Sequence, residues 1–546
     1  MSTVAAPRSR ALPRVPPKLR AFAAGPAGIA LFVGALLLIS LFLRTRALGA
    51  SLWMDEGLSI GIAGQPFLDI PGVLRQDGSP PFYYMLLHVW MELVGNGPSE
   101  TQGLSVAISL LAVPGGLWAG WSLFDRRTGL YCAALAAFNP FLTVYAQETR
   151  MYSLMVVLSL YATAAFLHAF VYRDRRYLPL FAVLLAAMLY THSWGIFVTA
   201  GALLTFGFVL LRSDERGPLL KDGLIAFGLA LALYLPWIPT LLYQVGHTGA
   251  PWLNSPRFGV AIQISKSLLG GGTATVALVL AAGSGLAAVV VGRTAEREKR
   301  VVYAAIALLV STLAVAWLFS QFSPAWTTRY LGVALGPLLI VAALGLARAG
   351  TLGLVALVIV LGIWAIPKTS TLENKSNAAD LAAAVQGTLQ PGDLVVTLQP
   401  EQAPLMHYHL PGGLQDDLVE ATQLGEVETK GVMDWRDVQD RLEAATPERN
   451  LEPLLDSLPR SQRVLLVYPV TTNISDWDAP WTETVRRRAA QWGRALELDD
   501  RFELVGAVPP FYRRAGRIGV RGVLYEKTSN QTSRPTETLR QASDSG

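Results

Sequence analysis

Long apolar segments recur along roughly the first two thirds of this 546-residue chain and constrain its fold more than any other feature. A helix of about 20 apolar residues crosses the hydrocarbon core of a bilayer, and it pairs its backbone polar groups within itself, as lipid requires. The first such segment covers residues 25–44. The others cover residues 103–124, 129–147, 151–172, 177–191, 195–211, 223–242, 262–292, 301–320, 329–348 and 351–367. The sequence therefore predicts a multi-pass α-helical membrane protein with about eleven transmembrane helices.

Composition agrees with this class, since 52% of the residues are hydrophobic and only 16% are charged. The net charge is +5, but the basic residues form short clusters between apolar segments. Such clusters report membrane topology, so we expect no nucleic-acid partner. Cys132 is the only cysteine, which excludes an intramolecular disulfide and a cysteine metal site.

The placement of basic residues predicts the orientation, because arginine and lysine concentrate on the cytoplasmic side of a membrane. Residues 1–24 form a basic tail without any acid, which we place in the cytoplasm. Arg44 and Arg46, at the far end of the first span, are expected to extend to the outer interface. Later clusters follow alternate spans and fall on the side of the N-terminus: Arg126 and Arg127, Arg173 to Arg176, Arg212 to Lys221, Arg293 to Arg300, and Arg348.

This orientation holds only if the apolar piece at residues 81–94 does not cross the membrane. We predict that it is a helix lying in the outer interface, because it begins with Pro80-Pro81, continues with aromatic residues and is short for a span. It belongs to a first outer loop at residues 49–102.

Almost every ionisable residue outside the basic clusters falls in the outer connections. Asp55 and Glu56 are the first two acids of the chain, and they follow directly on the first span, where lost hydration raises the cost of a charge. Taken singly, these residues have structural explanations: an interfacial acid pair, an arginine end cap at Arg329, a satisfied interfacial histidine at His192. Their gathering on one face indicates a site. Its candidate members are Asp55, Glu56, Asp77, Glu148, Arg150, Tyr152, His192, Arg329 and Tyr330.

These residue types suit glycosyl transfer from a lipid phosphate. An acceptor hydroxyl is a poor nucleophile near neutral pH, and a positioned carboxylate that takes its proton accelerates attack. The departing phosphate gathers negative charge, which arginine binds through paired hydrogen bonds. Aromatic rings can stack on sugar faces or prenyl chains, and a lipid donor needs a site at membrane depth.

Five stretches of the chain resemble motifs of the GT-C fold polytopic glycosyltransferases, in the branch with protein O-mannosyltransferases and aminoarabinose transferases (glycosyltransferase families 39 and 83). The resemblance covers about the first 370 residues, in the order of the family. The stretches are Trp53-Met54-Asp55-Glu56, Asp77-Gly78-Ser79-Pro80-Pro81-Phe82-Tyr83-Tyr84, Tyr145-Ala146-Gln147-Glu148-Thr149-Arg150-Met151-Tyr152-Ser153-Leu154, Tyr190-Thr191-His192 and Thr328-Arg329-Tyr330-Leu331.

The resemblance implies a transferase with Asp55 as general base and Glu56 as the alternative base. Attack on the face opposite the leaving phosphate is expected to invert the anomeric centre. It implies that the phosphate and sugar of a polyprenyl-phosphate donor face Arg150, Tyr152, His192, Arg329 and Tyr330. Asp77, Tyr83 and Glu148 are assigned to acceptor binding or positioning; Asp77 can also simply cap the interfacial helix. The chain has Ser79 where protein mannosyltransferases often have histidine before the paired prolines, so mannose or an arabinose-like sugar, and a glycan, lipid or protein acceptor, all stay open.

Composition changes after Pro367, where charged residues become frequent and no run is long enough to span. We predict an extracytoplasmic α/β domain at residues 368–527 and a disordered tail at 528–546. The domain is expected to have helices at 376–389 and 482–498, and strands at 394–398, 463–470, 502–508 and 518–525. No phosphate-binding glycine loop occurs in it, so we expect no nucleotide.

Two other classes compete with the enzyme. A transporter or flippase of lipid-linked sugars also needs charges along a lipid path, but it usually has interrupted helices at mid-membrane depth and internal repeats. A scaffold anchored by its spans needs fewer of them. We expect no required cofactor, although the acids can accommodate a divalent metal. The bias towards alanine, leucine and arginine suggests a bacterial plasma-membrane protein of the cell envelope.

Overall fold

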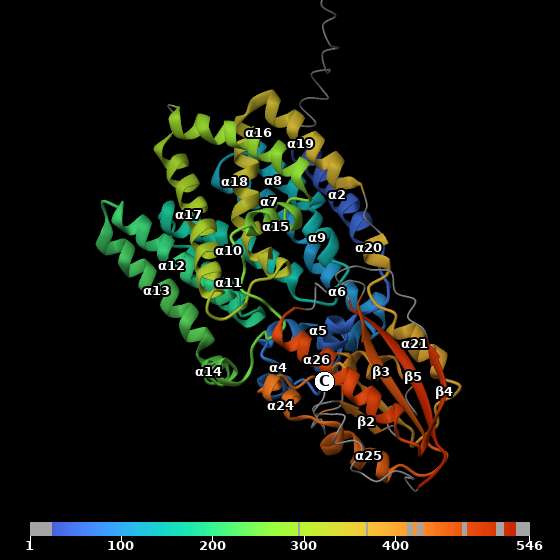
Figure 1. Ribbon diagram of the computed structural model, residues 1–546. Helices are drawn as coiled ribbons and strands as arrows, with labels where there is room; N and C mark the ends of the chain where they lie inside the picture. Colours follow the sequence, from blue (N-terminus) through green and yellow to red (C-terminus); the bar gives the residue numbers. More distant parts are fainter. Residues whose placement is uncertain are drawn as a thin grey trace, which may run out of the picture.

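The computed structural model describes residues 25–292, 295–366, 370–411, 419–422, 429, 431–471, 478–508 and 518–530. It has two parts, a bundle of helices that ends near residue 366 and a mixed domain built on a sheet (Figure 1). The predicted fold class, a multi-pass helical part followed by an α/β domain, is confirmed. The predicted basic tail at 1–24 and residues 531–546 of the predicted disordered tail lie outside the described residues.

The helical part contains the following elements. They are α2 (Pro26–Arg44), α3 (Met54–Ala63), α4 (Ile70–Asp77), α5 (Phe82–Val94), α6 (Pro98–Leu110), α7 (Ala112–Leu123), α8 (Arg126–Phe138), α9 (Pro140–Tyr145), α10 (Tyr152–Phe166), η1 (Leu167–Val171), α11 (Tyr177–Thr191), α12 (Gly195–Leu211), α13 (Arg216–Tyr234), η2 (Leu235–Trp237), α14 (Ile238–His247), α15 (Val260–Ser267), α16 (Gly272–Val291), α17 (Glu296–Phe319), η3 (Thr328–Ala334), α18 (Leu335–Arg348) and α19 (Gly350–Ala365).

Within the described residues, seven helical segments are long and apolar enough to cross a membrane. They are α2, α6 with α7, α10 with η1, α13 to α14, α16, α17, and η3 with α18. The other four predicted spans fall on shorter helices, namely α8 with α9, α11, α12 and α19. The chain is therefore a multi-pass membrane protein, and the total of eleven crossings stays a prediction.

Two predicted spans are interrupted. The span at 129–147 breaks at Pro140, which lacks a backbone N–H and disfavours helical geometry in the residue before it. The span at 262–292 breaks between α15 and α16, where Gly270 and Gly271 have φ angles of 73° and 114°. These positive φ angles are strained for other residues, so the glycine pair ends one helix and starts the next.

The predicted position of Arg44 at the membrane interface is wrong. Its side chain is fully buried in the bundle, where it donates to Ser109 Oγ at 3.0 Å and to the carbonyl oxygen of Ala136 at 2.7 Å. A buried guanidinium needs such partners, because an unpaired charge in an apolar bundle is costly. Arg46, two residues later, is exposed.

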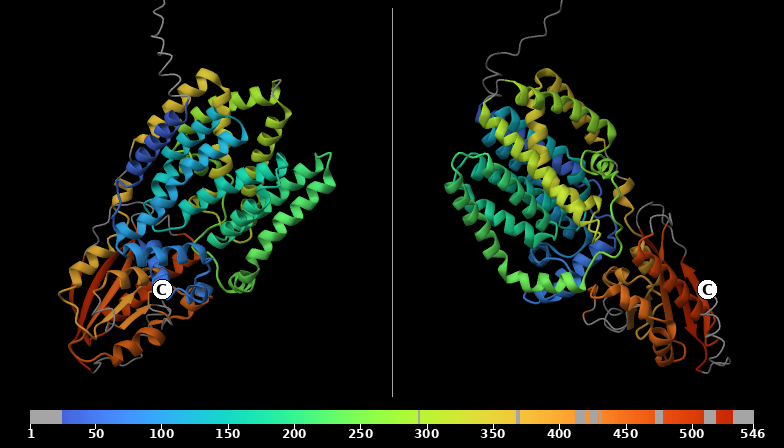
Figure 2. Two further views of the ribbon diagram at one scale, coloured as in Figure 1. Left: turned by 180° about the vertical axis from the view of Figure 1, so that it is seen from behind. Right: turned by 60° about the vertical axis from the view of Figure 1, so that its left-hand side comes forward.

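The first outer loop contains three short helices, α3, α4 and α5, between α2 and α6. Helix α5 occupies the piece at 81–94 that we predicted as a helix. All three lie at the end of the bundle that faces the C-terminal domain (Figures 1 and 2). The carboxylates of Asp55 and Glu56 belong to the first turn of α3, where the helix dipole favours negative charge.

The C-terminal domain is a five-stranded sheet with helices on both faces. Its strands run in the order β2-β1-β3-β5-β4; β1 is parallel to β2 and β3, and β5 is antiparallel to β3 and β4. Side chains alternate along β1, so that Val395 packs with the cluster around α21 and α22, and Leu394 and Val396 pack with the cluster around α25 and α26. The elements are α20 (Ser370–Glu373), α21 (Ala378–Val385), β1 (Leu394–Thr397), η4 (Pro400–Gln402), α22 (Ala403–His409), β2 (Val419–Thr422), α24 (Val438–Ala444), η5 (Pro447–Leu451), α25 (Glu452–Ser457), β3 (Arg463–Val470), α26 (Pro480–Glu497), β4 (Phe502–Val508) and β5 (Gly519–Lys527).

A buried ion pair joins the two parts. Lys375, just before α21, places its Nζ 2.7 Å from Oε2 and 2.9 Å from Oε1 of Glu56 in α3. Both side chains are almost fully buried, at 1% and 0% exposure. Gln102 and the backbone N–H of Thr149 also donate to Oε1 of Glu56, at 3.2 Å and 2.9 Å. The pair is therefore fully hydrogen-bonded, as a buried charge pair has to be.

Two glycines on one face of α3 allow the C-terminal domain to come close. A Cβ atom added to Gly57 would lie 2.8 Å from Cα of Leu405 in α22, and one added to Gly61 would lie 1.8 Å from the carbonyl oxygen of Gly431. Any side chain at these positions would push α3 away from the backbone of the C-terminal domain. The contact between the parts is thus a close backbone approach along one helix face.

We predict that Lys375→Met lowers the stability of the whole protein by about 3–5 kcal/mol, because it leaves the Glu56 carboxylate buried without its cation. Thermal unfolding of the detergent-solubilised protein, followed by tryptophan fluorescence, measures the effect. Lys299→Met is the matched control, since Lys299 pairs with the exposed Glu296 and such pairs contribute about 0–1 kcal/mol. Equal midpoints for Lys375→Met and the parent would contradict the prediction.

Candidate functional site

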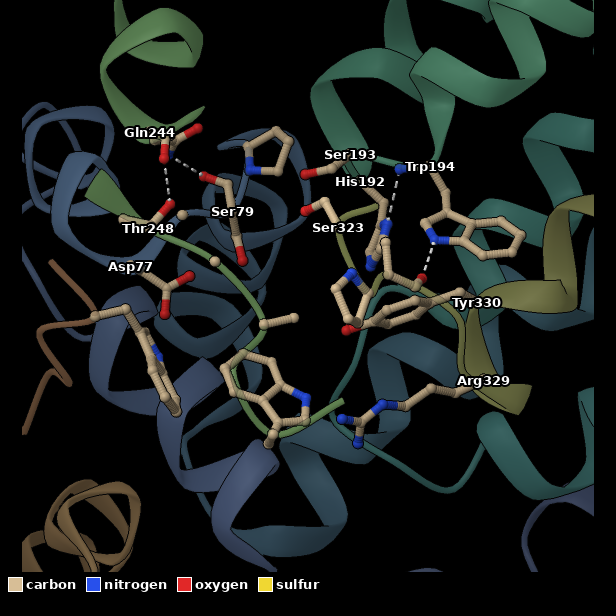
Figure 3. A pocket seen from close by; sticks show the side chains of 18 of the residues that line it. Asp77, Ser79, His192, Ser193, Trp194, Gln244, Thr248, Ser323, Arg329 and Tyr330 are labelled. Carbon is tan, nitrogen blue, oxygen red and sulfur yellow. Dashed lines mark hydrogen bonds between the residues drawn. The ribbon is translucent and has the colours of Figure 1, made fainter. Parts of the chain in front are cut away.

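A cavity of about 660 Å³ lies where the helical bundle meets the C-terminal domain (Figure 3). Its walls come from the first outer loop, from the connections after α11, α14 and α17, and from the C-terminal domain. Residues far apart in the sequence therefore meet around one cavity. Its polar lining includes Asp55, Asp77, Ser79, Arg150, His192, Ser193, Gln244, Thr248, Ser323, Arg329, Tyr330, Gln399, Glu401 and Thr482.

An ion pair between Asp55 and Arg329 forms the charged centre of the cavity. Oδ2 of Asp55 lies 2.5 Å from Nη1 of Arg329, and both side chains are largely buried. Asp55 comes from the first turn of α3 and Arg329 from η3, so the pair joins the first outer loop to the start of the α18 segment. The Nε–H of Arg329 is buried and donates to no described residue, so this guanidinium retains donor capacity.

A second arginine lies against the same turn of α3. Nη1 of Arg150 donates to the backbone oxygen of Asp55 at 3.2 Å and to Ser59 Oγ at 3.1 Å. The backbone oxygen of Arg150 in turn accepts from Ser105 at 3.2 Å. Two guanidinium groups therefore contact Asp55, one at its carboxylate and one at its backbone oxygen, which gives the cavity a locally positive region suited to an anion.

Asp77 lies on the opposite wall, at the end of α4 (Figure 3). Gly78 follows it with a φ of 91°, and a Cβ there would lie 2.7 Å from Thr248 Oγ1. Gln244 in α14 holds this turn by donating to the backbone oxygen of Ser79 at 3.3 Å. Burial raises the pKa of Asp77, with the Asp55 charge adding to the effect, against the lowering effects of Ser79 hydrogen bonds and of Arg150.

An aromatic group borders the Arg329 side of the cavity (Figure 3). The rings of His192 and Tyr330 are 4.5 Å apart between centroids, and Trp194 lies 5.9 Å from Tyr330. Burial, together with Arg150 and Arg329, lowers the pKa of His192 to about 3, so the ring is neutral at physiological pH. Its Nδ1 accepts the backbone N–H of Trp194 at 3.1 Å, which leaves the proton on Nε2.

The remaining wall is apolar and comes from three helices of the bundle, α12, α14 and α17. The cavity therefore has a charged end beside α3 and a hydrocarbon-like end between helices. Such a space suits an amphipathic ligand with an anionic head. The apolar lining consists of Ile196, Phe197, Ala200, Leu241, Val245, Val315 and Phe319.

The structure brings six of the ten candidate residues to the cavity: Asp55, Asp77, Arg150, His192, Arg329 and Tyr330. Tyr152 is fully buried beside them, 6.2 Å from the ring of Tyr330. Three others are buried outside the lining: Glu56 in its pair with Lys375, Tyr83 with its hydroxyl 3.4 Å from Ser105, and Glu148. Among the described residues, no three His, Cys, Asp or Glu side chains form a group that could hold a metal ion.

Sequence reasoning missed the contribution of the C-terminal domain, which adds Gln399, Glu401, Trp435, Thr482 and Ile518 to the wall. Nothing in the local sequence marks these residues, because the close approach of α22 to α3 brings them there. Burial raises the pKa of Glu401 to about 7, although the Trp481 indole that donates to Oε1 at 2.5 Å lowers it.

This pKa predicts how stability depends on pH. Because the folded pKa of Glu401 is above its ordinary value, the protonated form stabilises the folded protein at low pH, and this contribution is lost as pH rises through about 7. We expect Glu401→Gln to remove that loss, so that its unfolding midpoint changes less than the parent's between pH 5 and pH 8. Thermal unfolding at each pH measures this, with the exposed Glu503→Gln as control. Parallel pH profiles for the parent and Glu401→Gln would refute it.

Comparison with known proteins gives matches to solved structures alone. No protein-family model and no curated protein sequence matches the chain. ArnT from Cupriavidus metallidurans superposes with a TM-score of 0.57 at 12% identity, covering 94% of this chain and 100% of ArnT, and has also been solved bound to undecaprenyl phosphate. The mycobacterial arabinofuranosyltransferase AftD has a TM-score of 0.56 at 14% identity, with 94% of this chain aligned to 40% of AftD.

A third match is the archaeal oligosaccharyltransferase AglB from Archaeoglobus fulgidus, solved with an inhibitory peptide and a dolichol-phosphate. Its TM-score is 0.53 at 12% identity, and the alignment covers 93% of this chain and 75% of AglB. Identities this low show the fold alone, but the ArnT alignment covers both the helical part and most of the C-terminal domain. The chain therefore has the GT-C fold of polytopic glycosyltransferases.

Proposed function

We propose that this protein is a membrane glycosyltransferase that moves a sugar from a polyprenyl-phosphate donor to an acceptor hydroxyl. One observation carries the proposal: a single cavity joins Asp55, which contacts two arginines, to an apolar wall between helices of the bundle. The charged end suits the phosphate and the reacting centre, and the apolar wall suits the prenyl chain. The GT-C fold supports it, as do the structures of ArnT with undecaprenyl phosphate and of AglB with dolichol-phosphate.

In the proposed reaction, Arg150 and Arg329 bind the donor phosphate and Asp55 acts as general base. The acceptor oxygen attacks the anomeric carbon from the face opposite the phosphate, and its proton passes to the Asp55 carboxylate. The bond from the anomeric carbon to the phosphate oxygen breaks, and polyprenyl phosphate leaves with the electron pair. The anomeric centre is inverted. The free Nε of Arg329 supports this assignment, because the guanidinium can hold Asp55 and still donate to phosphate.

The other candidate residues take supporting roles. His192, Tyr330 and Tyr152 border the donor sugar and phosphate, and neutral His192 can donate through Nε2. Asp77 faces the acceptor side. Glu56 acts as a structural acid, because Lys375 and three further hydrogen bonds occupy its carboxylate. The two arginines supply the positive charge at the phosphate, so the proposed reaction needs no divalent metal.

We place the reaction on the extracytoplasmic face of a bacterial plasma membrane, with the N-terminus in the cytoplasm. The support comes from the sequence, where basic clusters follow alternate spans on the side of the N-terminus. The cavity and the C-terminal domain then lie outside. Mannose and arabinose-like sugars are the donors to test first.

We predict that Asp55→Asn lowers turnover by about 10²- to 10⁴-fold, the range of general-base catalysis, while donor affinity changes little. Purified protein in lipid nanodiscs would be given radiolabelled polyprenyl-phosphate sugars, with membrane extract as the acceptor source. Asp69→Asn is the matched control, because Asp69 is an exposed acid of the same loop outside the cavity. Full turnover in Asp55→Asn would remove Asp55 as the base.

We predict that Arg329→Gln weakens donor binding by about tenfold or more, because it removes a charged hydrogen-bond donor from the phosphate. The donor KM and direct binding of undecaprenyl phosphate measure the effect. Arg257→Gln, an exposed arginine outside the cavity lining, is the control. Unchanged donor affinity in Arg329→Gln would show that the phosphate binds elsewhere.

A further inference from the structure

Three tryptophans form a cluster beside the cavity where the segment after α14 meets the C-terminal domain. The rings of Trp252 and Trp435 are 4.5 Å apart between centroids, and those of Trp435 and Trp481 are 5.8 Å apart. Trp252 follows α14, whereas Trp435 and Trp481 belong to the C-terminal domain. Trp252 and Trp435 both line the cavity. The cluster is therefore a composite aromatic wall supplied by both parts of the protein.

Several bonds fix this wall in place. The backbone N–H of Trp435 donates to the carbonyl oxygen of Gln76, next to Asp77, at 2.9 Å. The backbone N–H of Asp437 donates to the carbonyl oxygen of His247 at 2.7 Å. Asn254 donates to the Asp478 carboxylate at 2.7 Å. The wall is thus held against both the first outer loop and the segment after α14.

A buried carboxylate stands beside the tryptophans. Glu401 in η4 lines the cavity at 5% exposure, and its Oε1 accepts the Trp481 indole N–H at 2.5 Å. Its Oε2 is buried, and it has no direct hydrogen bond to another described residue. The indole N–H of Trp252 is likewise buried without an acceptor in the described part of the chain. One donor and one acceptor at this end therefore lack a partner among the described residues, which is costly unless a ligand or water pairs with them.

This polar and aromatic end is close to the proposed base. The Gln399 side chain, two residues before Glu401, donates to the sulfur of Met54 at 3.7 Å, and Met54 directly precedes Asp55. Met54, Gln399 and Glu401 all line the cavity. A molecule held between the tryptophans and Glu401 can therefore present a hydroxyl towards Asp55.

We propose that this end of the cavity is the acceptor subsite and that the acceptor is a glycan, held by Glu401 and by the wall of Trp252 and Trp435. A sugar ring has an apolar C–H face and a rim of hydroxyls. The face packs on an indole, and the rim supplies the donors and acceptors that Glu401 and the Trp252 N–H lack. A lipid alcohol brings a single hydroxyl, which cannot pair with both the Glu401 carboxylate and the Trp252 N–H, and a serine- or threonine-rich peptide has no flat C–H face to pack on the indoles.

The inference rests on the proposed function, and its test separates the two. Purified full-length protein would be given a polyprenyl-phosphate sugar and, in parallel, neutral tetrasaccharides of mannose, arabinose or glucose, a serine- and threonine-rich decapeptide, and a glycan-free lipid alcohol. We expect transfer to a tetrasaccharide. Transfer to the decapeptide or to the lipid alcohol alone would overturn the inference and leave the glycosyltransferase standing.

Single substitutions test whether Glu401 and Trp435 bind the acceptor. We expect Glu401→Ala and Trp435→Ala each to raise the KM for the tetrasaccharide by about tenfold, the size expected for one buried charged hydrogen bond or one stacked ring. The donor KM should stay the same. Glu401→Gln keeps an acceptor for the Trp481 indole, so a purely structural role predicts full recovery of the affinity, whereas a carboxylate that also binds the glycan predicts only partial recovery. Glu503→Ala, an exposed acid of the same domain, is the control. An unchanged tetrasaccharide KM in Glu401→Ala and Trp435→Ala would overturn the assignment.

Direct binding gives a readout without turnover. Isothermal titration of the tetrasaccharides into the protein without donor should show binding to the parent and to Asp55→Asn, and loss of binding in Trp435→Ala. This holds even if the proposed reaction fails. No binding of any tetrasaccharide to the parent, under conditions where undecaprenyl phosphate binds, would refute the glycan subsite while the donor site survives.

Discussion

The buried pair between Glu56 and Lys375 is the interaction on which the rest of the site depends. It forces α3 against the C-terminal domain, because neither charge can be left unpaired in a dry interior. Asp55 occupies the same helical turn as Glu56, so the pair also fixes where the Asp55 carboxylate stands relative to Arg150 and Arg329. The two adjacent acids therefore have different roles. The Glu56 carboxylate joins the two parts of the protein, and the Asp55 carboxylate faces the cavity.

The cavity combines environments that a soluble protein rarely joins. Its charged end is built from loops and helix termini, which supply unpaired polar groups, and its apolar end is built from the apolar helices α12, α14 and α17. An ion pair at the boundary between them is partly desolvated, so electrostatic attraction to an incoming anion is stronger than at an open surface. This accounts for arginine at both cationic positions, since guanidinium keeps its charge when buried.

Much of this arrangement could be predicted from the sequence. The length of the apolar segments predicted where the helices lie, and strand β3 falls on its predicted residues. Helices and strands are predictable in this way because they follow from local sequence patterns. The Asp55, Arg150 and Arg329 motifs converge as their common placement in the outer connections suggested. The sequence could not predict the burial of Arg44, the place of Glu401 in the cavity wall, or the different partners of Asp55 and Glu56. Each of these depends on which distant segment packs there. The pairing of Glu56 with a lysine 319 positions later leaves no local pattern.

The glycine face of α3, formed by Gly57 and Gly61, restricts how the sequence of this protein can evolve. Because Gly57 and Gly61 meet backbone of the C-terminal domain directly, no side-chain adjustment can absorb a shift between the two surfaces. If α3 came from one related protein and the C-terminal domain from another, their contacting surfaces would have to match to within a fraction of an ångström. The first outer loop and the C-terminal domain must therefore diverge in step, as a single inherited unit, even though more than 300 residues of chain separate Gly57 and Gly61 from the backbone they meet.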